Sequence, residues 1–162
     1  MGCVGGYSGT NLRAVILDNL RSAYNAGSII RTVSALEYDS VALCGVTITP
    51  PSIKLKKTSR SLDEKVNWRY FKTTAEAVEK YKQDNYKIFA LEVMDSSELI
   101  TEMPQVENIA WVVGNEALGI DEAILKECDA IYHLPMLNKL EGINVSCAFS
   151  SVAFFEYLKF QI

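Results

Sequence analysis

The sequence has one histidine, four cysteines and no apolar run that approaches the length of a membrane span. A helix that crosses a bilayer needs about 18 or more consecutive apolar residues. The N-terminal residues lack the basic and apolar segments of a secretory signal. Gly6 stands where the myristoylation pattern requires Ser or Thr. We therefore interpret residues 1–10 as a flexible tail and expect a cytoplasmic protein without a membrane anchor.

The cysteines and the histidine do not form a recognisable metal site. Cys3, Cys44, Cys128 and Cys147 include no C-x-x-C pair and have no histidine partners at metal-binding spacing. Three of them lie in apolar segments, where a free cysteine is usually a small core residue, and this suits a reducing compartment. His133 is alone, so we expect it to be structural. No metal is predicted.

The common nucleotide-binding fingerprints are also missing. Neither G-x-G-x-x-G nor the P-loop pattern follows the first predicted strand, which disfavours the usual NAD and ATP sites. The net charge is −4 and the pI is about 5.1, whereas nucleic-acid-binding domains often have a basic balance. Local clustering counts for more than the total: residues 53–60 contain four basic side chains and no acid, namely Lys54, Lys56, Lys57 and Arg60.

Five short apolar segments predict buried strands: 12–17, 41–46, 87–93, 109–113 and 130–134. Helical patterns separate them. They are predicted over 25–36 with Asn25 as N-cap, after Thr73 and Thr74, over 121–128, and from about Asn144 onward. Residues 53–68 are predicted to be a basic loop followed by a short helix. Apolar strands that alternate with helices indicate an α/β fold with a parallel sheet covered on both faces. The length predicts one domain.

Ligands of such sheets bind outside the carboxyl ends of the strands. Two predicted strands end in informative loops, GNEALG at 114–119 and PMLNKLEG at 135–142. Gly114 and Gly119 either let a ligand approach the backbone or form a helix-entry turn with Glu116 near the positive end of a helix.

Three polar residues have an ordinary structural explanation that must be weighed. Asn144 and Ser146 both suit a helix N-cap, and capping alone would account for both. Arg31, one turn after Gly27, is either surface charge or a group that grips a phosphate or carboxylate.

Three segments taken together resemble the three motifs of the SpoU family. They are NAGSIIR at 25–31, VVGNEALGI at 112–120, and the stretch 134–148 that begins LPM and ends INVSCA. This family comprises S-adenosylmethionine-dependent RNA 2′-O-ribose methyltransferases of the SPOUT superfamily. The order and spacing agree from Asn11 onward, and KLKKTSRSLDEKVNWRYF is similar to the family's linking segment. The resemblance predicts a methyltransferase domain over residues 11–162.

The resemblance implies a fold and a cofactor. The expected fold is one domain with a parallel sheet of about six strands, helices on both faces and a C-terminal deep trefoil knot; Trp68–Phe71 is the candidate sixth strand. S-adenosylmethionine, with S-adenosylhomocysteine as product, would be held by three loops. The expected cofactor-binding residues are Val113, Gly114, Asn115, Leu134, Met136, Ile143, Val145 and Ser146.

The resemblance also implies catalytic roles. Arg31, Asn25, Glu116 and Asn144 match the family's catalytic positions. A ribose 2′-hydroxyl would attack the methyl group, and positioning would supply much of the rate. An arginine is a poor base because its pKa exceeds about 12, so we assign Arg31 to orienting the RNA phosphate and hydroxyl. The expected substrate is tRNA rather than rRNA, contacted by Lys54, Lys56, Lys57 and Arg60.

The third motif departs from the family pattern. Gly142 and Ile143 stand where Ser-Leu is common, and Asn138 replaces a glycine. The missing serine leaves one proposed catalytic contact open, which Ser146 would have to replace. The alternatives are a knotted RNA-binding protein that has lost catalysis, and an unrelated doubly wound enzyme with a different nucleotide ligand.

The last helix is apolar on two sides. One stripe comprises Val145, Ala148, Phe149, Val152 and Phe155, and a second comprises Cys147, Phe154 and Leu158. A helix of this kind needs two partners. We expect its own sheet on one side and the same helix of a second subunit on the other, in the homodimer that the resemblance implies.

Overall fold

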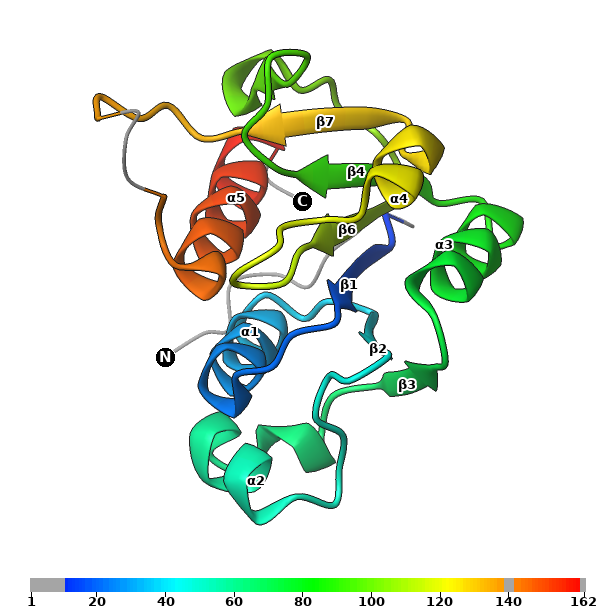
Figure 1. Cartoon of the computed structure of the whole chain (residues 1–162), viewed down its shortest axis with the longest axis vertical. Helices are drawn as coiled ribbons and strands as arrows, with labels where there is room; N and C mark the ends of the chain where they lie inside the picture. Colours follow the sequence, from blue (N-terminus) through cyan, green and yellow to red (C-terminus); the bar gives the residue numbers. More distant parts are fainter. Residues whose placement is uncertain (1–10, 139–141, 161–162) are drawn as a thin grey trace, which may run out of the picture.

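The computed structural model describes residues 11–138 and 142–160. The predicted tail, residues 1–10, lies outside this range. Seven parallel strands form one sheet in the order β3-β2-β1-β6-β4-β7-β5 (Figure 1). Their bounds are β1 Arg13–Asp18, β2 Ser40–Cys44, β3 Trp68–Phe71, β4 Lys87–Leu91, β5 Glu98–Leu99, β6 Ile109–Val113 and β7 Ala130–His133.

Five α-helices and two short 3-10 turns complete the described chain. The helices are α1 Ala23–Ala35, α2 Ile53–Ser59, α3 Thr74–Gln83, α4 Glu122–Glu127 and α5 Val145–Phe160, and the turns are η1 Leu62–Glu64 and η2 Ile100–Glu102. None of these helices is long and apolar enough to cross a membrane.

Alternation along β1 shows how the sheet is covered. Val15 and Leu17 belong to a core cluster with residues of α1, α2 and α5, whereas Ala14 and Ile16 belong to a second cluster with residues of α3 and α4. All four side chains are fully buried. A strand buried on both faces must be apolar throughout, and this is the pattern that made β1, β2, β4, β6 and β7 recognisable in the sequence.

The predicted fold class is confirmed, with one strand more than expected. Trp68–Phe71 forms the edge strand β3, as predicted. The seventh strand, β5, was missed because it has two exposed residues and no apolar pattern. The predicted trefoil knot depends on the connection from β7 to α5, and residues 139–141 of that connection lie outside the described range.

Two local predictions were wrong. Ser22, not Asn25, is the N-cap of α1: its hydroxyl accepts the N–H of Asn25 at 3.3 Å, and Asn25 is buried inside the first turn. Residues 53–59, predicted as a loop, form helix α2 with Ser52 as N-cap. Only Leu55 and Ser59 of α2 are buried, so the helix lacks the apolar periodicity that would have revealed it.

Gly27 permits close packing of two helices. A Cβ at this position would lie 2.2 Å from Oγ1 of Thr58 in α2. The same hydroxyl lies within hydrogen-bond distance of the carbonyl of Ala23, at 2.8 Å. Gly27 therefore brings α2 against α1, and this structural role accounts for it without a ligand.

The first apolar stripe of α5 faces the sheet. Phe149 and Val152 are fully buried, and Val145, Ala148 and Phe155 are partly buried. Cys147, Phe154 and Leu158 are exposed in the single chain. The expectation of a buried cysteine is thus wrong for Cys147. It holds for Cys44, where burial raises the pKa of the thiol to about 12.

A buried ion pair, which no local sequence pattern predicts, anchors the far end of α5. Glu156 and Arg13 form this pair, with exposed side-chain fractions of 1% and 4%. The carboxylate also accepts the indole N–H of Trp111 at 3.0 Å, and Arg13 donates to the carbonyl of Val106 at 3.0 Å. Burial raises the pKa of Glu156, although Arg13, Trp111 and Tyr38 act in the opposite direction.

Candidate active site

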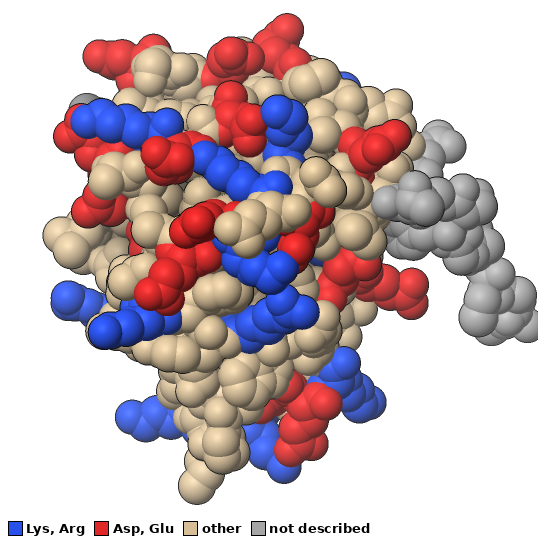
Figure 2. Space-filling view, turned by 90° about the vertical axis from the view of Figure 1, so that its right-hand side faces the viewer, with Lys and Arg blue, Asp and Glu red and all other residues tan. Residues whose placement is uncertain are grey.

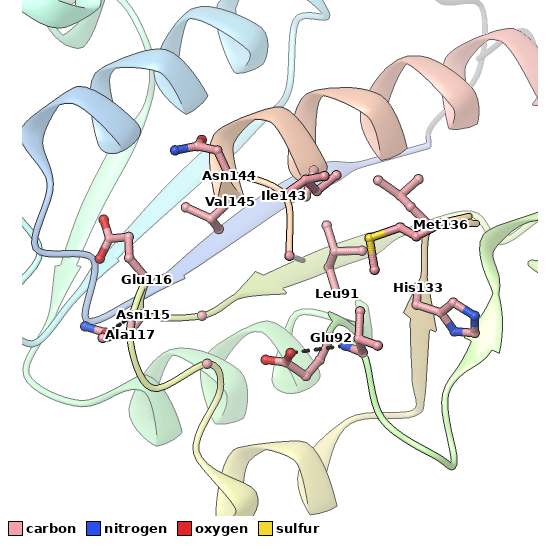
Figure 3. Close-up of a pocket in the computed structure, with 16 residues that line it drawn as sticks. Leu91, Glu92, Asn115, Glu116, Ala117, His133, Met136, Ile143, Asn144 and Val145 are labelled. Carbon is pink, nitrogen blue, oxygen red and sulfur yellow. Dashed lines mark hydrogen bonds between the residues drawn. The ribbon is translucent and has the colours of Figure 1, made fainter. Parts of the chain in front are cut away.

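A pocket of about 520 Å³ opens at the carboxyl ends of β4, β6 and β7. These strands are neighbours in the sheet, so their loops meet although they are far apart in sequence. Ile143 and Val145, at the start of α5, lie across the pocket from Leu91 and Glu92 (Figure 3). The wall consists of Leu91, Glu92, Val93, Gly114, Asn115, Glu116, Ala117, Gly119, His133, Leu134, Met136, Gly142, Ile143, Asn144, Val145 and Ala148.

Three predicted catalytic residues form a hydrogen-bonded relay at one side of the pocket. The side-chain amide of Asn25 donates to Oε1 of Glu116 at 2.9 Å. Asn144 donates from Nδ2 to Oδ1 of Asn25 at 3.0 Å. Asn25 therefore links the loop after β6 to the start of α5. The Asn144 side chain caps α5, because its Oδ1 accepts the N–H of Ser146 at 2.9 Å.

Glu116 binds the N-terminal end of α1. Its two carboxylate oxygens accept the backbone N–H groups of Arg21 and Ser22 at 3.1 and 3.0 Å. Burial raises the pKa of Glu116, but the hydrogen bonds from Asn25 and from backbone amides outweigh it, so the pKa lies below its ordinary value. Glu116 does sit at the positive end of a helix. That helix is α1, not the helix that follows Glu116 in the chain.

The loop after β6 is closed tightly on itself. Asn115 and Gly119 exchange two backbone hydrogen bonds of 3.0 and 2.9 Å. A Cβ on Gly114 would lie 2.4 Å from the carbonyl carbon of Gly119. The amide of Asn115 donates to the carbonyl of Asn19 at 2.7 Å. This loop therefore presents a fixed backbone to the pocket, and only glycine fits at position 114.

Glu92 is a pocket residue that the sequence did not single out. Its Oε2 accepts the N–H of Ile120 at 3.1 Å, and its Oε1 accepts the N–H of Val93 at 3.1 Å. The carboxylate thereby joins the loop after β4 to the loop after β6. The rule that ligands bind at strand ends would have suggested Glu92, but only the strand order places β4 beside β6 and β7.

Comparison with known proteins now identifies the family. The model of the SpoU rRNA methylase family matches residues 13–154, which include all three loops of the pocket and the relay. The chain belongs to the SpoU family.

Curated relatives are similar over most of this chain. The 23S rRNA (guanosine(2553)-2′-O)-methyltransferase RlmP of Bacillus subtilis is 25% identical over 139 residues, which are 86% of this chain and 55% of RlmP. A putative TrmH family tRNA/rRNA methyltransferase of Staphylococcus haemolyticus is 26% identical over 148 residues, 90% of this chain and 58% of that protein. The chain thus spans little more than half the length of these relatives.

Solved structures share the fold. The SpoU methyltransferase AviRb of Streptomyces viridochromogenes, in complex with AdoMet, has a TM-score of 0.85 at 16% identity over 93% of this chain and 61% of AviRb. A structure that concerns the 2-OH methylation of C/U34 on tRNA has a TM-score of 0.83 at 22% identity, over 94% of this chain and 99% of that one.

Most residues predicted to bind the cofactor of this SpoU protein line the pocket. Gly114, Asn115, Leu134, Met136, Ile143 and Val145 are on its wall, and Val113 and Ser146 are not. Val113 is fully buried at the end of β6. Ser146 is buried, and its hydroxyl donates to Oδ1 of Asn144 at 2.6 Å. A ligand would reach these two residues only indirectly.

Arg31 is not brought to the pocket of its own SpoU chain. It lies on the exposed side of α1, whereas Asn25 lies on the buried side, and Arg31 is absent from the pocket wall. No hydrogen bond or ion pair joins Arg31 to another residue within the described part of the chain. The structure therefore brings together Asn25, Glu116 and Asn144 but leaves the fourth predicted catalytic residue apart.

The predicted RNA-binding residues are exposed on α2. Lys54, Lys56 and Lys57 lie on the helix and Arg60 is its C-cap. Nζ of Lys56 pairs with Glu64 at 2.7 Å, so this cluster is partly neutralised. Figure 2 shows positive and negative side chains interspersed on the face that includes α3 and α4, so that face has no patch of a single sign. Within the described residues, no group of His, Cys, Asp or Glu is arranged to hold a metal.

Proposed function

We propose that this SpoU protein is an S-adenosylmethionine-dependent RNA 2′-O-ribose methyltransferase. The observation that carries the proposal is the relay of Asn25, Glu116 and Asn144 at the rim of a pocket built from the SpoU motif loops. Family membership supports the chemistry, and RlmP is a relative whose name specifies 2′-O methylation.

The pocket suits S-adenosylmethionine in size and in character. Its volume of about 520 Å³ falls within the usual range of about 300–1,000 Å³ for small-molecule sites. Leu91, Leu134 and Ile143 offer apolar surface for an adenine ring, and the glycine positions expose backbone groups beside it. Glu92 and Glu116 are acidic, and no lysine or arginine is on the described wall, which suits a cationic sulfonium. S-adenosylmethionine would supply the methyl group.

The relay would hold the acceptor side of the site in a fixed geometry. Glu116 accepts three N–H groups, so its carboxylate is pinned and its charge is stabilised. Asn25 and Asn144 are oriented by the same set of bonds. Positioned groups of this kind lower the entropic cost of bringing a hydroxyl to the methyl group. Asn144 stands between Ile143 and Val145 in the sequence, and both of these apolar residues line the pocket. We therefore assign Asn144 to orienting the hydroxyl or the cofactor.

Arg31 would act at the pocket of a second subunit. It lies on the exposed side of α1 and makes no described contact with the relay of its own chain. Helix α5 packs against α1 through the Thr32–Ser150 hydroxyl pair at 2.7 Å and leaves Cys147, Phe154 and Leu158 exposed to solvent. A homodimer that covers this apolar face would carry Arg31 of each copy to the other copy. There the guanidinium would orient the RNA phosphate and the 2′-hydroxyl.

The substrate is proposed to be tRNA. This chain aligns with nearly the whole of the structure that concerns tRNA methylation at C/U34, which supports tRNA. A second candidate is rRNA, which is favoured by the similarity to RlmP. The α2 cluster of Lys54, Lys57 and Arg60 would contact the phosphate backbone in either case.

Cofactor binding and methyl transfer test the proposal together. We expect calorimetry to show binding of S-adenosylmethionine and S-adenosylhomocysteine. Methylation of total RNA from a deletion strain, followed by nucleoside mapping, should yield 2′-O-methylated nucleosides in tRNA. Arg31→Ala should abolish methylation and keep cofactor affinity, whereas Arg69→Ala, at an exposed position on β3, should keep both. A protein that binds neither ligand would refute the proposal.

A catalytically impaired RNA-binding protein is the second candidate function. Gly142 favours it, because the serine common in the family is missing there. Transfer of labelled methyl groups from S-adenosylmethionine to bulk tRNA would exclude this alternative. The unrelated doubly wound enzyme is excluded by membership of the SpoU family.

A further inference from the structure

Tyr24 is the most exposed aromatic side chain among the residues that the structure describes, with 69% of its surface accessible. It lies in the first turn of α1. Positions 24, 28, 31 and 35 follow each other at spacings of four, three and four residues and share one face of the helix. Tyr24, Arg31 and Ala35 are exposed there, and Ser28 is half-buried. Arg21, just before the helix, is exposed as well. Exposed cations therefore stand three residues before and seven residues after an exposed aromatic ring.

This face is directly attached to the relay. Tyr24 precedes Asn25, the residue whose amide bonds both Glu116 and Asn144. Glu116 also holds the backbone N–H groups of Arg21 and Ser22. The backbone that carries Tyr24 is thus pinned on both sides by contacts of the proposed catalytic site, while the ring itself points away from the core.

The same turn of α1 adjoins the basic helix α2. Oγ1 of Thr58 lies 2.8 Å from the carbonyl oxygen of Ala23 and 3.0 Å from that of Lys54. The residue before Tyr24 and the first turn of α2 are therefore held together. Lys54 and Lys57 are exposed on α2. The first turn of α1 is thus held by Glu116 and contacts α2, and exposed basic side chains lie both just before α1 and on α2.

Such a combination is typical of single-stranded RNA binding. Basic side chains follow the phosphates, and an exposed ring accepts the flat face of an unpaired base. We propose that Tyr24 is a stacking platform for an unpaired RNA base that flanks the nucleotide to be methylated, with Arg21 and Lys54 holding the adjoining phosphates. This inference rests on the proposed RNA methyltransferase function and assigns part of its substrate recognition.

The test compares variants of Tyr24 by RNA binding and methylation. We expect Tyr24→Ala to weaken binding of a short labelled oligoadenylate by about 5-fold or more, and to raise the KM for tRNA while the affinity for S-adenosylhomocysteine stays unchanged. Tyr24→Phe and Tyr24→Trp retain a ring and should stay close to wild type. Tyr70→Ala, which removes a tyrosine of 53% exposure on the edge strand β3, is the matched control and should have no effect.

Salt dependence separates stacking from charge. Tyr24→Ala should leave the slope of log affinity against log salt concentration unchanged, whereas Arg21→Ala and Lys54→Ala should each reduce that slope by about 1. A purely structural role for Tyr24 would not produce this division.

Three outcomes would overturn the inference. The first is equal RNA affinity of Tyr24→Ala and wild type. The second is a loss of RNA affinity in Tyr24→Phe as large as that in Tyr24→Ala. The third is a change of oligomeric state in Tyr24→Ala, which would assign the ring to a contact between subunits. Absence of S-adenosylhomocysteine binding by the wild type would instead refute the proposed function. The two failures are therefore distinguishable.

Discussion

At the scale of single residues, the candidate site depends on polar side chains that already form hydrogen bonds to other groups of the protein. The side-chain carbonyl of Asn25 accepts a hydrogen bond from Asn144, and its amide nitrogen donates one to Glu116. The side-chain amide nitrogen of Asn115 donates to the carbonyl of Asn19. Side chains committed in this way hold a loop in one shape before a ligand arrives. The sequence predicted Asn25 and Asn115 as site residues, and the structure places Asn115 on the pocket wall and Asn25 against two residues of that wall. It assigned Asn25 the wrong local role, because a cap depends on which hydroxyl reaches the first free N–H group.

Glu116→Gln tests the charge of the relay. The pKa of Glu116 is lowered in the folded protein, so its ionised form stabilises the fold at pH values above the ordinary glutamate pKa of about 4.3. This contribution is lost as the pH falls through the lowered pKa. We expect the wild type to be more stable than Glu116→Gln at pH 7, by about 0.5–1 kcal/mol for an exposed group at a helix N-terminus. The gap should close below about pH 4. Thermal melts of both proteins across this range measure it, and a gap that is independent of pH would contradict the assignment.

Gly114→Ala tests the closed loop after β6. The added Cβ would meet backbone atoms of Gly119 and Ile120 at 2.4 and 2.6 Å, so the loop must shift. Overpacking of this kind costs about 1–3 kcal/mol, and calorimetry should show loss of S-adenosylhomocysteine binding. Gly142→Ala is the matched control, because no atom of the described residues, its chain neighbours aside, lies within 4 Å of the Cβ that it adds. Equal behaviour of the two variants would show that the loop is pliable.

At the scale of elements, α5 is held at both ends by different means. Its N-terminal end is capped by Asn144 within the relay, and its last turns are tied to β1 and β6 by Glu156. Phe149 and Val152 pack the helix on the sheet between these points. The apolar stripe predicted from the sequence is correct. Glu156 escaped prediction because a glutamate is almost never buried unless it is paired with an opposite charge. Its partner, Arg13, is 143 positions away in the sequence, so no local pattern joins the two residues.

Glu156→Ala should destabilise the protein strongly. It leaves the guanidinium of Arg13 buried without its counter-charge, and breaking a buried pair in this way costs about 3–5 kcal/mol. Urea denaturation measures the change. Lys126→Ala removes a pair with Glu122 in which both side chains are exposed, at 70% and 81%, and such pairs contribute at most about 1 kcal/mol. A loss in Glu156→Ala no larger than that of the control would mean that water or a rearranged partner replaces the carboxylate.

At the scale of the whole molecule, one chain contains a pocket and a relay but keeps Arg31 outside them. Helix α1 must bury Asn25, Ile29 and Ile30 toward the sheet and α5. A residue at position 31 then lies on the exposed side of α1, outside the pocket wall. We therefore propose that a second copy of the chain completes the site, and the exposed apolar stripe of α5, Cys147, Phe154 and Leu158, is suited to bind it.

Phe154→Asp tests this assembly. A carboxylate in a buried contact between subunits would have to lose its hydration, so we expect the dimer to dissociate. Phe154 is 45% exposed in the single chain, and the monomer should therefore keep its fold. Sedimentation should show a monomer that has lost methylation. Ile53→Asp, at a position on α2 with 89% exposure, is the control and should remain dimeric. Active monomers of Phe154→Asp would show that Arg31 is not shared.

The sequence alone determined the family and most of the element types, whereas β5 and α2 escaped it because neither has an apolar periodicity. Five of the seven strands are apolar on both faces, and that pattern is local, as are the three motifs that carry the resemblance. Only the tertiary structure decided which loops meet, that Glu92 joins the pocket wall, that Glu116 serves α1, and that Glu156 is buried. The physical reason is the same in each case. These contacts join groups that are distant in the chain, and their energies depend on strand order and helix packing, which no periodicity along the chain records.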